Sequence, residues 1–124
     1  MSVPDTICLL DDDPSVLKAL GRLFASEGLE TEKFIDPALF IAYAESHPVR
    51  LAVVDVRMPG TNGIEVMMRL RSVSPETKVI IMTAESDPWN RTSALAGGAS
   101  AFFLKPFDDA AFVEAVRAAI PPIS

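Results

Sequence analysis

Residues 51–60 have the sequence LAVVDVRMPG, in which an apolar run of strand length ends in the carboxylate of Asp55. The Pro59-Gly60 turn follows almost at once, and a short apolar run closed by turn residues is typical of a strand buried on both faces. An ionised carboxylate in mid-strand would be strongly destabilising unless it were paired or bound to a metal. We therefore expect Asp55 at the carboxyl end of its strand, at the edge where open α/β sheets bind their ligands.

Length and composition predict one globular domain. The chain has 124 residues, of which 49% are hydrophobic and 23% are charged, so we expect a single domain over 1–124 with a core at about 6–120. No apolar run approaches the roughly 20 residues of a membrane helix, and no signal segment opens the chain. The net charge of −6 argues against direct nucleic-acid binding by this segment. The lone cysteine, Cys8, is expected to be a core residue and favours a cytoplasmic location.

Strand-like and helix-like stretches alternate along the chain. Three helices are predicted to begin where an aspartate can cap the helix N-terminus and a proline follows it, at Asp13-Pro14, Asp36-Pro37 and Asp87-Pro88. Two further helices begin at Thr61 or Asn62 and at Asp108 or Asp109. The expected strands lie at 6–10, 30–35 (an edge strand), 51–55, 78–82 and 100–104. Strand followed by helix, five times, predicts an α/β fold with a parallel sheet covered by helices on both faces.

The chain carries two glycine or proline pairs that are expected to end helices. Gly97-Gly98 is predicted to stop the fourth helix, and Pro121-Pro122 is predicted to end the fifth and to begin a linker. No internal repeat, low-complexity tract or linker interrupts the alternation of strands and helices. The sequence therefore favours one uninterrupted sheet.

Chemically active side chains follow four of the predicted strands. Because the carboxyl ends of parallel strands meet at one edge, we expect a shared crevice lined by Asp11, Asp12, Asp55, Thr83 and Lys105. Three carboxylates repel one another, and a divalent cation makes such a cluster tolerable. Ligands that offer only oxygen suit Mg²⁺ or Mn²⁺. With an ammonium group and a hydroxyl nearby, the set suits phosphoryl transfer to a carboxylate.

Each of these signals has an ordinary structural interpretation when taken alone. An acidic pair before proline is often a helix cap, and Asp13 is expected to be one. A single aspartate after a strand is more often a turn residue than a nucleophile. Thr83 and Lys105-Pro106 can also end strands without any function. Their joint placement at the ends of the first, third, fourth and fifth strands is what favours a functional site.

Taken together, the motifs resemble the response-regulator receiver domain of bacterial two-component signalling. They are LDD at 10–12, Asp55 followed by Met58-Pro59 and Gly63, Thr83-Ala84, and FLKPF at 103–107. The resemblance covers about 6–120. It implies a flavodoxin-like, doubly wound five-stranded parallel sheet of order 2-1-3-4-5 with five helices. The run DVRMP and the Lys-Pro-Phe ending resemble, more narrowly, the receivers of LuxR-type transcription regulators.

The resemblance also implies a role for each acidic residue. Asp55 corresponds to the phosphoryl acceptor and is one of the residues around the metal. Asp12 corresponds to the direct Mg²⁺ ligand, Asp11 to a ligand that acts through water, and the backbone carbonyl of Arg57 to a further ligand. Mg²⁺ (or Mn²⁺) is therefore the expected cofactor.

Four more positions take their expected roles from the same resemblance. Thr83 corresponds to the switch hydroxyl and Lys105 to the phosphate-binding lysine, whose bond to Pro106 is expected to be cis. Phe102 stands at the position of the switch aromatic, where many members have tyrosine. As a phenylalanine it can swing inward as an apolar plug, but it cannot donate a hydrogen bond in an outward pose.

Two residues at the mouth of the expected site carry opposite charges. Arg57 lies two residues beyond Asp55, and Glu85 lies two residues beyond Thr83. Both sit where side chains can tune the lifetime of the phosphoryl group. A salt link between them would contribute little to stability if it is exposed.

The implied function is a phosphorylation-dependent switch rather than a conventional enzyme, although the domain would catalyse its own Mg²⁺-dependent phosphorylation and dephosphorylation. A sensor histidine kinase would donate the phosphoryl group to Asp55. The surface formed by the fourth helix, fifth strand and fifth helix would then change, as a homodimer interface or as a contact with a C-terminal DNA-binding output domain absent from this chain.

Two other functions remain open at this level. A phosphohydrolase of the haloacid-dehalogenase type would also use an aspartate at a strand end, but it usually needs a second acid two residues later, where this chain has Arg57. A phosphate-silent dimerisation module is the other alternative. The complete set of acids, threonine and lysine speaks against it.

Several remaining side chains are expected to be structural. Trp89 is placed in the core in preference to an exposed contact, and Met67, Met68 and Met82 are interpreted as core residues. His47 is expected at the surface, before Pro48 in a loop.

Overall fold

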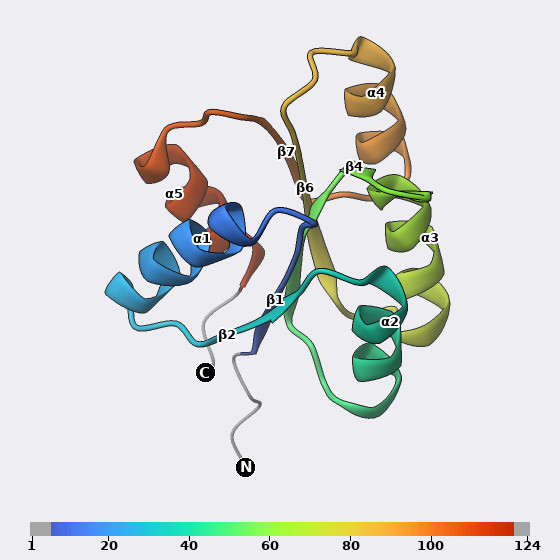
Figure 1. Cartoon of the computed structure of the whole chain (residues 1–124), viewed down its shortest axis with the longest axis horizontal. Helices are drawn as coiled ribbons and strands as arrows, with labels where there is room; N and C mark the ends of the chain where they lie inside the picture. The colour runs from blue at the N-terminus through green and yellow to red at the C-terminus, as the bar shows by residue number, and fades with distance from the viewer. Residues whose placement is uncertain (1–5, 121–124) are drawn as a thin grey trace.

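The computed structural model describes residues 6–120, which form a five-stranded parallel sheet with helices on both faces (Figure 1). In spatial order the strands are β2 (Thr31–Phe34), β1 (Ile7–Leu10), β3 (Leu51–Asp55), β6 (Lys78–Thr83) and β7 (Ala101–Leu104). All four neighbouring pairs run parallel. The predicted fold class and strand order are therefore confirmed, and β2 is an edge strand as expected.

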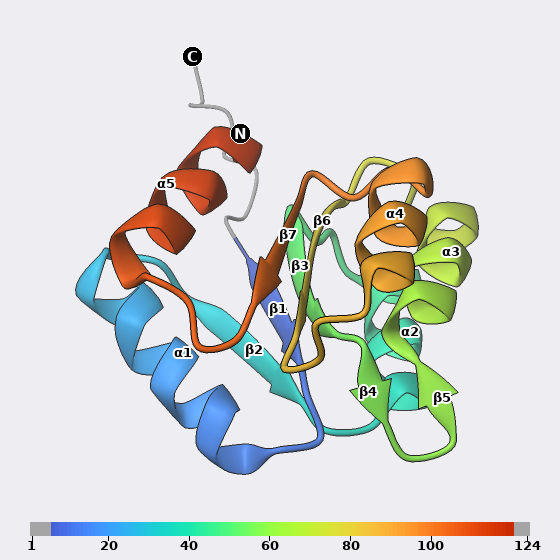
Figure 2. The ribbon, with the colours of Figure 1, turned by 90° about the horizontal axis from the view of Figure 1, so that it is seen from above.

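The five helices divide between the two faces of the sheet. Figure 2 shows α1 (Pro14–Ser26) and α5 (Asp109–Ala119) on one face and α2 (Pro37–Ser46), α3 (Gly63–Val73) and α4 (Pro88–Ala96) on the other. No helix within 6–120 is both long enough and apolar enough to cross a membrane. Pro121-Pro122, predicted to end α5, lies outside the described residues.

Acidic and amide side chains cap the helices as their sequence positions predict. The carboxylates of Asp13, Asp36 and Asp87 each accept a backbone N–H two residues later at 2.9 Å, and a proline follows each as the first helical residue. At the other two helices, Asn62 accepts the N–H of Ile64 at 2.7 Å, and Asp108 accepts the N–H of Ala111 at 2.9 Å. Each cap satisfies a donor that the helix itself leaves unpaired.

The two faces of the sheet carry separate apolar clusters because successive side chains of a strand point to opposite sides. Under α2, α3 and α4 lie the strand residues Cys8, Leu10, Ala52, Val54, Val79 and Ile81. Under α1 and α5 lie Ile7, Leu9, Leu51, Val53, Ile80 and Met82. Cys8 is fully buried, which confirms it as a core residue, and burial raises the pKa of its thiol to about 12, so the thiol stays protonated.

A small antiparallel hairpin follows Asp55 and was not predicted. Its strands are β4 (Arg57–Met58) and β5 (Thr61–Asn62), joined by Pro59-Gly60. Gly60 has φ +77°, a conformation that glycine adopts without strain. Two-residue strands are too short to show an alternating pattern, so Pro59-Gly60 was the only sign of this hairpin in the sequence.

Two placements in the core were wrong. Trp89 is 62% exposed and Met68 is 51% exposed. In α4 the inward positions belong to Asn90 and Ala94, which leaves Trp89 outside. In α3 Met67 is buried and Met68, the next residue, is turned about 100° away from it. Met67 and Met82 are in the core as predicted, and His47 is exposed as expected.

Candidate functional site

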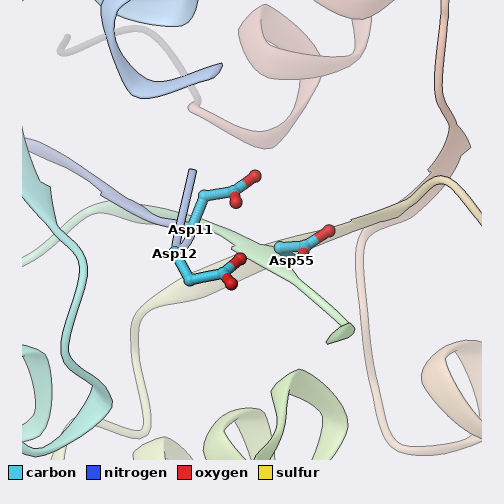
Figure 3. Close-up of side chains that lie close together, drawn as sticks. All are labelled: Asp11, Asp12 and Asp55. Carbon is cyan, nitrogen blue, oxygen red and sulfur yellow. The ribbon is translucent and has the colours of Figure 1, made fainter. Parts of the chain in front are cut away.

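Three carboxylates gather at the carboxyl edge of the sheet (Figure 3). Asp11 and Asp12 directly follow β1, and Asp55 is the last residue of the neighbouring β3. One oxygen from each lies within 4.8 Å of the other two. Asp11 and Asp55 are 1% and 5% exposed, whereas Asp12 is exposed. The topology that ends two adjacent strands at one edge thus brings together residues that are more than forty positions apart.

Lys105, which directly follows β7, places its ammonium group between two of these acids. Its Nζ atom lies 2.9 Å from Oδ2 of Asp11 and 3.1 Å from Oδ1 of Asp55. Burial opposes ionisation of Lys105, but the hydrogen bonds to Asp11 and Asp55 outweigh it and raise the pKa of Lys105 above its ordinary value. The bond between Lys105 and Pro106 is cis.

Asp55 is hard to ionise in this setting. Burial first, and then the negative charge of Asp11 and more weakly that of Asp12, raise the pKa of Asp55 from 3.8 to about 6, although Lys105 acts in the opposite direction. One ammonium group therefore does not fully balance the three carboxylates. The atoms that could bind a metal are all carboxylate oxygens, and Asp12 is exposed to solvent. This set fits a hard divalent cation such as Mg²⁺ or Mn²⁺.

Asp11, which is buried, and Asp12, which is exposed, differ in their remaining contacts. Oδ1 of Asp11 accepts the N–H of Asp13 at 2.9 Å, and its Oδ2 accepts from Lys105. Within the described residues, the carboxylate of Asp12 makes no hydrogen bond and no ion pair. Asp12 is therefore the acid of the pair whose oxygens are freer to bind a ligand directly.

Thr83 and Phe102 lie on the face of the sheet that α4 covers. Thr83 is the last residue of β6 and is fully buried, and its Oγ1 accepts the N–H of Glu85 at 3.1 Å. Ile81, two residues earlier on the same face, pairs in register with Phe102 of β7. The Phe102 ring is partly buried against the cluster on this face, and the guanidinium of Arg91 from α4 lies 6.0 Å from its centre. The structure thus places Phe102 on the face of the sheet that α4 covers.

An ion pair joins the segments that follow β3 and β6. The guanidinium of Arg57 contacts the carboxylate of Glu85, and their side chains are 70% and 40% exposed. The salt link that the sequence left open is therefore formed at the surface.

Gly63 has a positional role that its sequence motif alone did not reveal. Its N–H donates to the carbonyl of Val56 at 2.8 Å, and the N–H of Val56 donates to the carbonyl of Met82 at 2.9 Å. A Cβ atom at Gly63 would collide with the backbone carbonyl of Asp55. Absence of a side chain therefore lets the β4–β5 hairpin return against the strand end that carries the acceptor candidate.

This fold and this site define an α/β domain whose acidic edge, at the switch point of a doubly wound sheet, is suited to a divalent cation. The sequence pattern of the response regulator receiver domain matches residues 7–117. The chain belongs to the response regulator receiver domain family, the receiver module of two-component systems. A receiver domain is not a conventional enzyme.

Known proteins share the domain at moderate identity. Over 112 residues the chain is 37% identical to the transcriptional regulatory protein FixJ of Azorhizobium caulinodans, an alignment that covers 90% of this chain and 53% of FixJ. It is 33% identical to the response regulator protein TodT of Pseudomonas putida, with 92% and 50% covered. The chain thus spans about half the length of both relatives.

Solved structures show the same architecture. A CheY-like response regulator receiver domain protein from Methanospirillum hungatei superposes with a TM-score of 0.88 at 25% identity, which covers 96% of this chain and 94% of that one. The likeness supports the strand order and the positions of the five helices described above.

Proposed function

We propose that this domain is a phosphorylation-dependent signalling switch in which Asp55 accepts a phosphoryl group. The observation that carries the proposal is the placement of Asp55 at the strand end, 3.1 Å from the ammonium group of Lys105 and within 4.8 Å of Asp11 and Asp12. Phosphoryl transfer to a carboxylate needs positioning and neutralisation of charge, and this cluster offers both.

The acidic residues are suited to hold Mg²⁺ (or Mn²⁺). Asp12 and Asp55 would bind it directly together with the backbone carbonyl of Arg57, and Asp11 would act through water. This division agrees with the contacts of the acids, because both oxygens of Asp11 already accept hydrogen bonds. When bound, the cation would offset the carboxylate charge and stabilise negative charge on the phosphoryl oxygens.

Asp55 acts as the nucleophile. One of its carboxylate oxygens attacks phosphorus, and the bond from phosphorus to the donor breaks, with its electron pair leaving on the imidazole nitrogen of a kinase phosphohistidine or on the oxygen of a small acyl phosphate. Lys105 remains protonated and moves from Oδ1 of Asp55 to an oxygen of the transferred group. The raised pKa of Lys105 keeps it charged for this role.

Thr83 and Phe102 transmit the change. The hydroxyl of Thr83 turns to the new phosphoryl group and gives up the N–H of Glu85, which alters the segment that leads into α4. Phe102, on the same face of the sheet, moves inward into the space released. The expected result is a shift between two arrangements of the α4, β7 and α5 surface.

The partners follow from the receiver family. The donor would be a sensor histidine kinase in the cytoplasm. Three apolar residues of α4 and β7, Trp89, Leu95 and Leu104, are exposed at 62%, 42% and 45%, which supports this surface as the contact for a second receiver or for an output domain. Because FixJ is named a transcriptional regulatory protein and is about twice as long as the matched segment, we propose a DNA-binding output domain as the element controlled.

Phosphotransfer followed by intact mass tests the acceptor. We expect the parent chain, incubated with acetyl phosphate and Mg²⁺, to gain one phosphoryl group, and Asp55→Asn to gain none. Asp109→Asn is the matched control, because Asp109 is an exposed aspartate in the first turn of α5. Equal labelling of the parent and Asp55→Asn would refute the assignment of the acceptor. Repeated turnover of a phosphate ester would instead favour a phosphohydrolase.

A further inference from the structure

The helix α4 is held to the rest of the domain by little apolar packing. Of its nine residues, only Asn90 and Ala94 are buried. Each of the other helices buries at least three residues, and these include large apolar side chains such as Phe24, Phe40, Leu70 and Phe112. A helix whose inner face offers one amide and one methyl group gains little free energy from burial. Besides the guanidinium of Arg91 over the ring of Phe102, its position therefore depends on contacts at its ends.

At its C-terminal end, α4 is attached to α3. The guanidinium of Arg71, in the last turn of α3, donates a hydrogen bond to the carbonyl of Gly97, the residue that ends α4. A helix leaves its last carbonyls without partners and carries partial negative charge there. A cation that donates to such a carbonyl is the kind of contact that stabilises a helix C-terminus.

The Gly97-Gly98 pair allows this close approach. A Cβ atom at Gly97 would lie 2.7 Å from Cε of Met67, and one at Gly98 would collide with the guanidinium of Arg71. Gly98 also has φ +102°, a backbone conformation that residues with a side chain rarely adopt. The pair that ends α4 in sequence thus also makes room for two side chains of α3.

The N-terminal end of α4 is tied to a different part of the molecule. Asp87 caps the helix and accepts the N–H of Trp89 at 2.9 Å. The segment before this cap begins at Thr83, whose hydroxyl accepts the N–H of Glu85. Any rearrangement at Thr83 therefore reaches α4 first through the end that carries Trp89.

We propose that Arg71 is a positioning residue, which fixes the C-terminal end of α4 to α3 so that a change at Thr83 moves the Trp89 end about this fixed point. The fixed point stands on the contacts of this structure, whereas the movement rests on the proposed phosphorylation switch. Arg71 touches neither the acceptor nor its ligands, and acts through α4.

Amide hydrogen exchange tests the fixed point without any phosphoryl chemistry. The amides of Gly97, Gly98 and Ala99 donate to carbonyls of Ser93, Leu95 and Ala94 and so report on this end of α4. In Arg71→Gln we expect these three amides to exchange faster by roughly five- to tenfold, as for the loss of one solvent-exposed hydrogen bond. Core amides such as that of Val53 should keep their rates.

Two variants separate anchoring from a general effect. Arg71→Lys keeps a cationic donor and is expected to restore most of the protection. Arg69→Gln removes a neighbouring exposed arginine of α3 that makes no ion pair or side-chain hydrogen bond within 6–120, and should exchange like the parent. Unchanged exchange at Gly97 and Gly98 in Arg71→Gln, or equal acceleration in the core, would overturn the proposal.

Binding of beryllofluoride, a phosphoryl mimic, with Mg²⁺ tests the movement. In the parent, we expect the amide chemical shifts of Trp89 and Asn90 to change more than those of Gly97 and Gly98. In Arg71→Gln, the changes in the amide chemical shifts of Gly97 and Gly98 on binding should become nearly as large as those of Trp89 and Asn90. Equal changes along α4 in the parent would overturn the fixed point. If the amides of Asp55 and Thr83 do not respond at all, the phosphoryl switch fails and the movement with it, while the exchange data still decide the role of Arg71.

Discussion

The Nζ atom of Lys105 lies 2.9 Å from Oδ2 of Asp11, although the two residues are 94 positions apart in the chain. Asp11 is almost completely buried, and its other carboxylate oxygen accepts the N–H of Asp13. Lys105 is therefore shared between the acid that it neutralises and Asp55, 3.1 Å away. The ammonium group that would meet the phosphoryl group thus already bridges two acids of the site.

Replacing Lys105 by methionine should raise the pKa of Asp55 further above its value of about 6, because the hydrogen bond and the charge that lower it are lost. We expect the free energy of unfolding without metal to fall by about 2 kcal/mol, less than for a fully buried pair because the Lys105 side chain is 20% exposed. Carboxyl ¹³C NMR titration measures the pKa and urea unfolding the stability. Lys78→Met, at the opposite end of the sheet, should change neither.

The raised pKa of Asp55 predicts how stability depends on pH in metal-free protein. The folded state keeps the proton of Asp55 up to about pH 6, whereas the unfolded state loses it near 3.8. Stability from this group is present in full below pH 3.8 and is lost as pH rises through about 6. Asp55→Asn lacks this loss, so the variant should gain about 2 to 3 kcal/mol on the parent between pH 4 and 7.

Urea unfolding in EDTA across this pH range measures the difference. Adding Mg²⁺ at pH 7 should raise the stability of the parent more than that of Asp55→Asn, because a ligand that binds only the folded state stabilises it. A constant difference between the two proteins from pH 4 to 7 would contradict the assignment of the shifted pKa to Asp55.

Much of the candidate site was predictable because a parallel sheet sends all its carboxyl ends to one edge. Asp11, Asp55 and Lys105 needed only to be recognised as strand ends for their convergence to follow, and the structure joins them by contacts of 2.9 and 3.1 Å. The strand order is different in kind, because periodicity does not say which strands are neighbours. That order came from the resemblance to receivers.

The errors came from helices whose two sides are not clearly different. In α4, the apolar Trp89 and Leu95 face outward while Asn90 is buried, the reverse of the usual pattern. The contact between Arg71 and the carbonyl of Gly97 left no signal either, because any backbone carbonyl can accept it. Such contacts are set by how two helices approach, which the spacing of apolar residues does not encode.

Thr83→Ala should separate phosphorylation from its consequence. The variant loses the hydroxyl that accepts the N–H of Glu85, at an expected cost of about 1 kcal/mol in unfolding free energy. Labelling of Asp55 by acetyl phosphate should persist. In the parent we expect phosphorylation to change the fluorescence of Trp89, the single tryptophan, and in Thr83→Ala this change should be largely lost. Thr83→Ser keeps the hydroxyl and should keep the response. A full fluorescence change in Thr83→Ala would remove Thr83 from the switch.

Glu85→Gln removes the charge that pairs with Arg57 at the mouth of the site. Because both side chains are well exposed, the free energy of unfolding should change by no more than about 0.5 kcal/mol. With Arg57 released from this ion pair, we expect water to reach the phosphoryl group on Asp55 more easily. Hydrolysis of that group should then accelerate roughly two- to fivefold, which corresponds to a barrier lowered by up to about 1 kcal/mol. Phosphate release after removal of the donor measures this rate, and Glu65→Gln on α3 is the control. An unaltered lifetime would mean that the ion pair does not cover the site.

Gly63→Ala should disturb the acceptor through its backbone. The added Cβ meets the carbonyl of Asp55, and the hairpin cannot yield easily because the N–H of Gly63 is bonded to Val56. We expect the free energy of unfolding to fall by about 2 to 3 kcal/mol, as in overpacked cores, with slower labelling of Asp55. Gly60→Ala is the matched control, because no atom lies within 4 Å of its Cβ position and only the strain of φ +77° remains, at about 1 kcal/mol. If Gly60→Ala proves the more harmful of the two for labelling, the turn itself, rather than the approach of Gly63 to Asp55, controls the geometry of the acceptor.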